Sequence, residues 1–134
     1  MKKILFVEDQ PEYKLGVLFG WFKLKNIPVE YEIVGSVTEA KLYLRKKENK
    51  VDLVVTDLGL PIFTGEIVKN LLQGMDLVYD MDDFNKEVPV IINSTTFVPN
   101  FEYAKEEYEE RGQELYKVDS IMDIKEWLMD FLMN

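Results

Sequence analysis

The chain has neither cysteine nor histidine among its 134 residues. Without cysteine there is no disulfide framework and no thiolate metal site. Without histidine there is no imidazole ligand, no histidine general base and no Ser-His triad. These absences exclude much enzyme chemistry and leave oxygen atoms as the candidate metal ligands.

Positive charge is also scarce, because 25 acidic residues face 16 basic ones and the net charge is −9. Such a charge repels phosphate backbones and anionic lipids, so we expect no nucleic-acid or membrane partner and favour a protein partner. The apolar stretch near the N-terminus, 4–7, is too short for a signal-peptide core and runs directly into acids. We therefore expect the protein in the cytoplasm.

The length and composition predict one domain over residues 1–134. With 47% hydrophobic residues, the chain is long enough for one core and too short for two comfortable domains. We find no internal repeat and no linker.

Strand-like and helix-like segments alternate along the chain. The expected strands are 3–7, 29–34, 51–56, 88–93 and 114–118. The expected helices are 11–25, 38–45, one from near Gly65 to 73–74, 101–111 with Asn100 as its cap, and one from a Ser120 cap to 133. This alternation predicts an α/β fold, a doubly wound five-stranded parallel sheet with helices on both faces in three layers.

Two of the predicted strands end in carboxylates. Glu8 and Asp9 follow the first strand, and Asp57 follows the third. Because the carboxyl ends of neighbouring parallel strands meet at one crevice, we expect these acids to converge, with no basic residue beside them in sequence. Such a cluster either raises its own pKa values or holds a cation, and hard oxygen ligands favour Mg²⁺.

These motifs resemble the receiver domains of two-component response regulators, over nearly the whole chain. The resemblance rests on the acidic pair Glu8-Asp9, on the Asp-x-x-x-Pro-x-x-x-Gly segment that starts at Asp57, and on Ser94 after the fourth strand. It implies a flavodoxin-like fold and a signalling protein that is not an enzyme beyond its own phosphorylation and dephosphorylation. It also implies that Asp57 accepts a phosphoryl group from a histidine kinase or phosphotransfer protein, and that a downstream protein partner receives the signal.

The resemblance implies roles for the other site residues. Asp9, Asp57 and the backbone carbonyl of Gly59 would hold Mg²⁺, with Glu8 reaching the ion through water. Ser94 would donate its hydroxyl to a phosphoryl oxygen. Phosphoryl transfer needs mainly positioning and charge neutralisation, which suits this set.

The family's lysine at the end of strand five has two candidates here. Counting forward from Ser94 favours Lys117, whereas counting from Gly112 puts Asp119 in that position. With Lys117 the site has its ammonium. With Asp119 it lacks one, and the alternative function is a degenerate receiver that serves as a constitutive protein-binding module without phosphorylation.

Three segments have an ordinary and a functional interpretation. Residues 75–86 resemble an insertion, which we expect to be a solvated loop, with a partner contact as the alternative. The apolar surface of 11–25 is expected to be core, with a partner or homodimer face as the alternative. The acidic face of 101–111 is expected to be solvated, with a basic partner as the alternative.

Overall fold

The computed structural model describes residues 1–61, 73–84 and 87–134. Its centre is a sheet of five strands in the order β2-β1-β3-β4-β5. The strands are β1 Lys3–Val7, β2 Glu30–Val34, β3 Leu53–Thr56, β4 Val90–Asn93 and β5 Leu115–Val118. All four pairings are parallel. The predicted five-stranded parallel sheet is confirmed.

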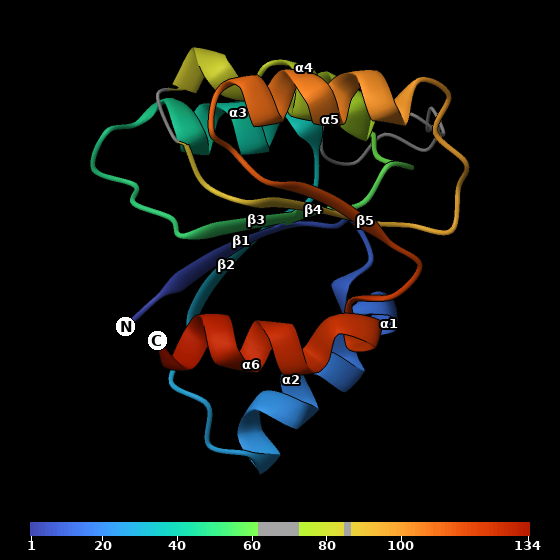
Figure 1. Ribbon diagram of the computed structural model, residues 1–134. Coiled ribbons are helices and arrows are strands. Elements are labelled where there is room, and N and C mark those ends of the chain that lie inside the picture. The colour runs from blue at the N-terminus through green and yellow to red at the C-terminus, as the bar shows by residue number, and fades with distance from the viewer. Residues whose placement is uncertain (62–72, 85–86) are drawn as a thin grey trace.

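Helices cover both faces of the sheet (Figure 1). One face carries α3 (Val37–Arg45), α4 (Gly74–Tyr79) and α5 (Phe101–Glu110), with the 3₁₀ helix η1 (Met81–Phe84) after α4. The other face carries α1 (Pro11–Lys14), α2 (Gly16–Leu24) and α6 (Lys125–Met133), with the 3₁₀ helix η2 (Ile121–Ile124) before α6. Within the described residues, no helix combines the length and the apolar composition that crossing a bilayer requires.

Two hydrophobic cores follow from the alternation of side chains along the strands. In β1, Leu5 and Val7 pack into the core under α3, α4 and α5, while Ile4 and Phe6 pack into the core beside α2 and α6. The middle strands β3 and β4 are buried along their whole length, as expected for parallel strands covered on both sides.

The segment 11–25 forms two helices, where the sequence predicted one. The helix is interrupted at Leu15, the C-cap of α1, whose backbone N–H donates to the Pro11 carbonyl at 2.8 Å. Leu15 is buried in the core beside β1. Gly16, a poor helix former, begins α2 directly afterwards. The break leaves Lys14 as the last residue of α1, facing the ends of the strands.

The prediction of a solvated loop over 75–86 is wrong for the part of it that the structure describes. Residues 74–79 form α4 and 81–84 form η1. Their apolar side chains Met75, Leu77, Val78, Met81 and Phe84 are buried in the same core as α3 and α5. The helix predicted from Gly65 lies outside the described residues except for its last two positions, where Gly74 instead begins α4.

The two predicted caps have different outcomes. Ser120 accepts a hydrogen bond from the Met122 amide at 3.2 Å and begins η2, which leads into α6. Asn100 precedes α5 in a left-handed backbone conformation with φ 60°, and its side chain makes no capping hydrogen bond.

Candidate functional site

The site is built from the first residue after each of four strands. Glu8 follows β1, Asp57 follows β3, Ser94 follows β4 and Asp119 follows β5. The strand ladder continues through three of them, because Glu8, Asp57 and Ser94 donate backbone N–H groups to the carbonyls of Val34, Val7 and Val118 at 2.9, 3.0 and 3.0 Å. The rigid sheet therefore fixes the backbone of these residues at one edge.

The three predicted metal-ligating acids come together. Glu8, Asp9 and Asp57 each offer a carboxylate oxygen, and these oxygens lie within 4.8 Å of one another. Glu8 and Asp57 are almost completely buried, each with 3% of its surface exposed. Three carboxylate oxygens at this spacing suit a hard divalent cation such as Mg²⁺.

Crowding and burial change the acidity of one member of this cluster. Desolvation, followed by repulsion from the Asp57 carboxylate, raises the pKa of Glu8 from 4.5 to about 7. A hydrogen bond from the Gln10 backbone N–H to Glu8 Oε2, at 3.1 Å, opposes the rise. The site therefore has an unfavourable excess of negative charge near neutral pH, which a cation relieves.

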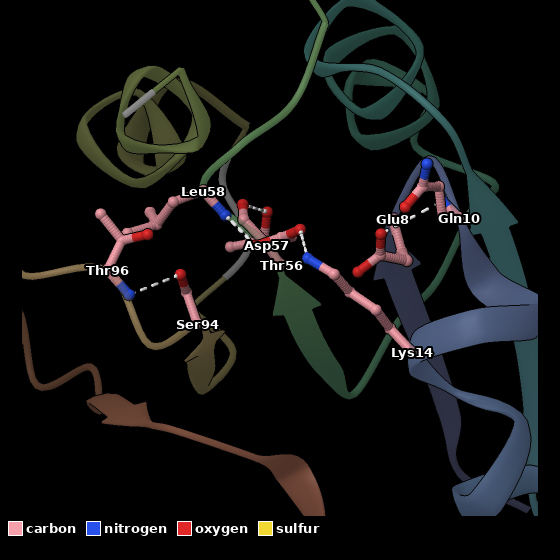
Figure 2. A network of polar contacts seen from close by, with 8 residues as sticks. All are labelled: Glu8, Gln10, Lys14, Thr56, Asp57, Leu58, Ser94 and Thr96. Carbon is pink, nitrogen blue, oxygen red and sulfur yellow. Dashed lines mark hydrogen bonds and ion pairs between the residues drawn. The ribbon is translucent and has the colours of Figure 1, made fainter. Parts of the chain in front are cut away.

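Lys14 supplies a cation that the sequence did not predict. Its Nζ lies 2.5 Å from Asp57 Oδ2, and Figure 2 shows the side chain reaching from α1 to this carboxylate. Partial burial lowers the pKa of Lys14, but the hydrogen bond to Asp57 and the charges of Glu8 and Asp57 outweigh burial and raise it. Lys14 and Asp57 are 43 residues apart in sequence, so no local pattern indicated this contact.

Both carboxylate oxygens of Asp57 are engaged. Oδ1 accepts a hydrogen bond from the Leu58 backbone N–H at 2.7 Å, and Oδ2 faces Lys14. The Thr56 hydroxyl donates to the Asp57 carbonyl at 2.9 Å, which further fixes the main chain (Figure 2). Asp57 Oδ2 therefore carries the ammonium contact, and Asp57 Oδ1 carries the backbone contact.

An open pocket of about 590 Å³ adjoins Asp57, which leaves room for a phosphoryl group. Its lining consists of Tyr13, Lys14, Asp57, Gly59, Asn93, Ser94, Thr95, Thr96, Asp119 and Ser120. The Ser94 Oγ accepts a hydrogen bond from the Thr96 amide at 3.1 Å, as a turn serine does. The hydroxyl proton of Ser94 remains available for donation, because this bond uses only a lone pair.

Lys117 lies apart from this pocket. Its Nζ donates to the Ser94 backbone carbonyl at 2.9 Å and lies 3.9 Å from Asp119 Oδ1. Its side chain lines two other surface pockets, both beside Phe101 of α5. Among the described residues, the ion pair of Asp57 is with Lys14 and that of Lys117 is with Asp119, which is the first residue after β5.

Solved structures similar to this chain include receiver domains of response regulators, and the chain has their fold. The non-phosphorylated HemR receiver domain from Leptospira biflexa is similar over 100% of this chain and 96% of that one, with TM-score 0.66 and 20% identity. The phosphorylated cyanobacterial phytochrome response regulator RcpA is similar over 99% and 94%, with TM-score 0.66 and 23% identity. The Mn²⁺-bound response regulator Rcp1 is similar over 97% and 91%, with TM-score 0.63 and 19% identity.

No protein-family model and no curated protein matches the sequence. At these identities the likeness defines the fold, and it does not define the chemistry of the site.

Proposed function

We propose that this protein is a cytoplasmic receiver that accepts a phosphoryl group on Asp57 and passes the signal on through protein contacts. The donor is the phosphohistidine of a histidine kinase or phosphotransfer protein. The observation that carries the proposal is the convergence of Glu8, Asp9 and Asp57 at one edge of the sheet, beside a pocket that Ser94 also lines.

The transfer is a displacement at phosphorus. A carboxylate oxygen of Asp57 attacks the phosphorus, a P–O bond forms and the P–N bond breaks. The electron pair of the P–N bond stays on the imidazole nitrogen, and the ring leaves neutral when its other nitrogen is protonated. Ser94 donates its hydroxyl to a phosphoryl oxygen, and the buried backbone of Asp57 keeps the nucleophile in place.

The acid cluster fits Mg²⁺ by its donor set. Asp9, Asp57 and the Gly59 carbonyl would hold the ion, with Glu8 acting through water. When bound, Mg²⁺ neutralises charge on the acids and on the transferred oxygens. In the absence of the ion, the Lys14 ammonium balances part of that charge.

Intact-mass measurement after incubation with phosphoramidate and Mg²⁺ tests the proposal. The wild type should gain the mass of one phosphoryl group, and Asp57→Asn should gain none. Asp52→Asn, which removes an acid on the loop before β3, is the matched control and should label as the wild type does. Equal labelling of wild type and Asp57→Asn would refute Asp57 as the acceptor.

A second candidate function is a constitutive protein-binding module with a receiver fold. Two observations favour it: Asp119 follows strand β5 where a lysine was expected, and Asp57 is already paired with Lys14. The same measurement separates the two candidates, because the module takes no label at any Mg²⁺ concentration.

A further inference from the structure

Lys14 is the basic residue among the described residues that line the pocket beside Asp57. Its Nζ touches the carboxylate at 2.5 Å, and its side chain keeps 39% of its surface exposed while that of Asp57 keeps 3%. The carboxylate of this ion pair is therefore enclosed by protein, whereas the lysine side chain borders solvent. A lysine carries its ammonium on a flexible four-carbon stem. The ammonium can therefore move by a few ångströms from one negatively charged group to a neighbouring one.

The local fold of α1 directs Lys14 to this position. The helix is a single turn, in which the Lys14 amide donates to the Gln10 carbonyl at 3.1 Å. The next residue, Leu15, is buried in the core beside β1 and keeps that turn against the sheet.

Lys117, the lysine that the sequence favoured as the cation of the site, contacts other groups. The Lys117 ammonium bonds to the Ser94 carbonyl and lies near Asp119, and its side chain is 19% exposed on the α5 side of the sheet. The residue that follows β5 at the sheet edge, Asp119, carries the wrong charge for contacting a phosphoryl group. The pocket thus needs its positive charge from another element.

We infer that Lys14 is the phosphoryl-facing cation of this site, a catalytic role that has moved from strand five to the first helix. Before transfer the ammonium holds the Asp57 carboxylate. During transfer the Lys14 ammonium leaves the carboxylate oxygen and contacts the oxygens of the phosphoryl group. These oxygens then carry the negative charge that lies nearest to the ammonium. This inference rests on the proposed receiver function and names the residue that completes it.

Removing the positive charge of Lys14 should raise the affinity for Mg²⁺ and lower the rate of phosphorylation. In Lys14→Met, which keeps most of the apolar stem, Mg²⁺ no longer competes with an ammonium for Asp57 and should bind more tightly, by roughly threefold to tenfold. Phosphorylation should nevertheless slow by about tenfold or more, because a preorganised charge on the transferred oxygens is lost. A residue with a merely structural role would not produce this opposition.

The experiment measures Mg²⁺ affinity by calorimetry and labelling by phosphoramidate at saturating Mg²⁺, for wild type and four variants whose folding is checked by circular dichroism. Lys14→Met should show both effects, and Lys14→Arg should regain most of the labelling rate. Lys23→Met, which removes an exposed lysine of α2, should match the wild type. Lys117→Met should lose less of the labelling rate than Lys14→Met does.

A labelling rate of Lys14→Met within twofold of the wild type would overturn the inference, whatever happens to Mg²⁺ affinity. A large loss of labelling in Lys117→Met with none in Lys14→Met would overturn it in favour of the strand-five lysine. A wild type that takes no label refutes the receiver function itself, so the two failures are distinguished by the wild-type arm alone.

Discussion

Gly74, the first residue of α4, lies directly against the backbone of Asp57. Its amide donates to the Leu58 carbonyl at 2.9 Å, and a Cβ added at Gly74 would lie 2.2 Å from the Asp57 carbonyl oxygen. No real side chain tolerates that distance, and the neighbouring atom belongs to the main chain and cannot rotate away. The start of α4 is therefore packed against the main chain of the proposed phosphoacceptor.

This contact predicts that Gly74→Ala is costly. The added methyl group should displace either α4 or the Asp57 main chain and lower the free energy of unfolding by about 1–3 kcal/mol. Gly20→Ala is the matched control, because Gly20 lies in α2 with open space where the Cβ would stand. The control should gain roughly 0.5–1 kcal/mol from helix propensity. Urea unfolding curves measure both, and equal stability of the two variants would contradict the contact.

A second contact joins α4 to α5. The Tyr108 hydroxyl donates to the Val78 carbonyl at 2.6 Å, and the Tyr108 side chain is only 1% exposed. Val78 belongs to the last turn of α4, whose carbonyls have no partner within the helix. Tyr108→Phe should leave this carbonyl unpaired and reduce stability by about 1–2 kcal/mol in urea unfolding. Tyr13→Phe, at an exposed tyrosine, should change stability by less than ~0.5 kcal/mol.

The sequence predicted the strands of the sheet correctly but not the helix α4. The strands were predictable because runs such as 3–7 and 51–56 are apolar and β-branched, which is typical of strands covered on both faces. Residues 75–86 were expected to be a loop because they resemble an insertion, while the spacing of Met75, Val78 and Met81 is helical and these side chains are buried. An apparent insertion therefore did not indicate a solvated loop.

The acid cluster predicts a stability that depends on Mg²⁺. Millimolar Mg²⁺ should raise the melting temperature of the wild type, because an ion that binds only the native state stabilises it by mass action. Asp9→Ala removes one ligand and one charge, so it should abolish that rise while making the metal-free protein more stable. Glu48→Ala, on the loop before β3 and so at the opposite edge of the sheet, should keep the full response. A wild type that shows no response to Mg²⁺ in differential scanning fluorimetry would argue against the site.

The site illustrates a second limit of sequence reasoning. Four site residues were predictable because each lies within two residues of the end of an apolar run in the sequence. They are Glu8, Asp9, Asp57 and Ser94. The end of β5 is less visible, since Lys117 and Asp119 both lie near it, and only the pairing of Asn93 with Val118 fixes which residue comes first after the strand. Lys14 was not predictable at all, because its contact with Asp57 depends on how α1 packs against the sheet.

The acidity of Glu8 predicts how stability depends on pH in protein treated with EDTA. Burial and Asp57 raise the pKa of Glu8 to about 7 in the folded protein, while Asp9 also repels its charge and Lys14 and the Gln10 amide attract it. Between pH 4.5 and 7 the folded state therefore holds a proton that the unfolded state has lost. The bound proton stabilises the folded state fully at or below pH 4.5. This stabilisation decreases as the pH rises from 4.5 to about 7 and does not change further above that. The total decrease in the free energy of unfolding is up to about 3 kcal/mol.

Glu8→Gln should flatten that decrease, because glutamine keeps the shape of the protonated carboxyl and has no proton to lose. The variant should therefore exceed the wild type in stability at pH values above the window and match it below, in urea unfolding curves recorded across the range. Glu48→Gln, at an exposed glutamate, should reproduce the wild-type slope. Parallel pH profiles for wild type and Glu8→Gln would mean that Glu8 ionises at its ordinary pKa and that the acids do not crowd one another in solution.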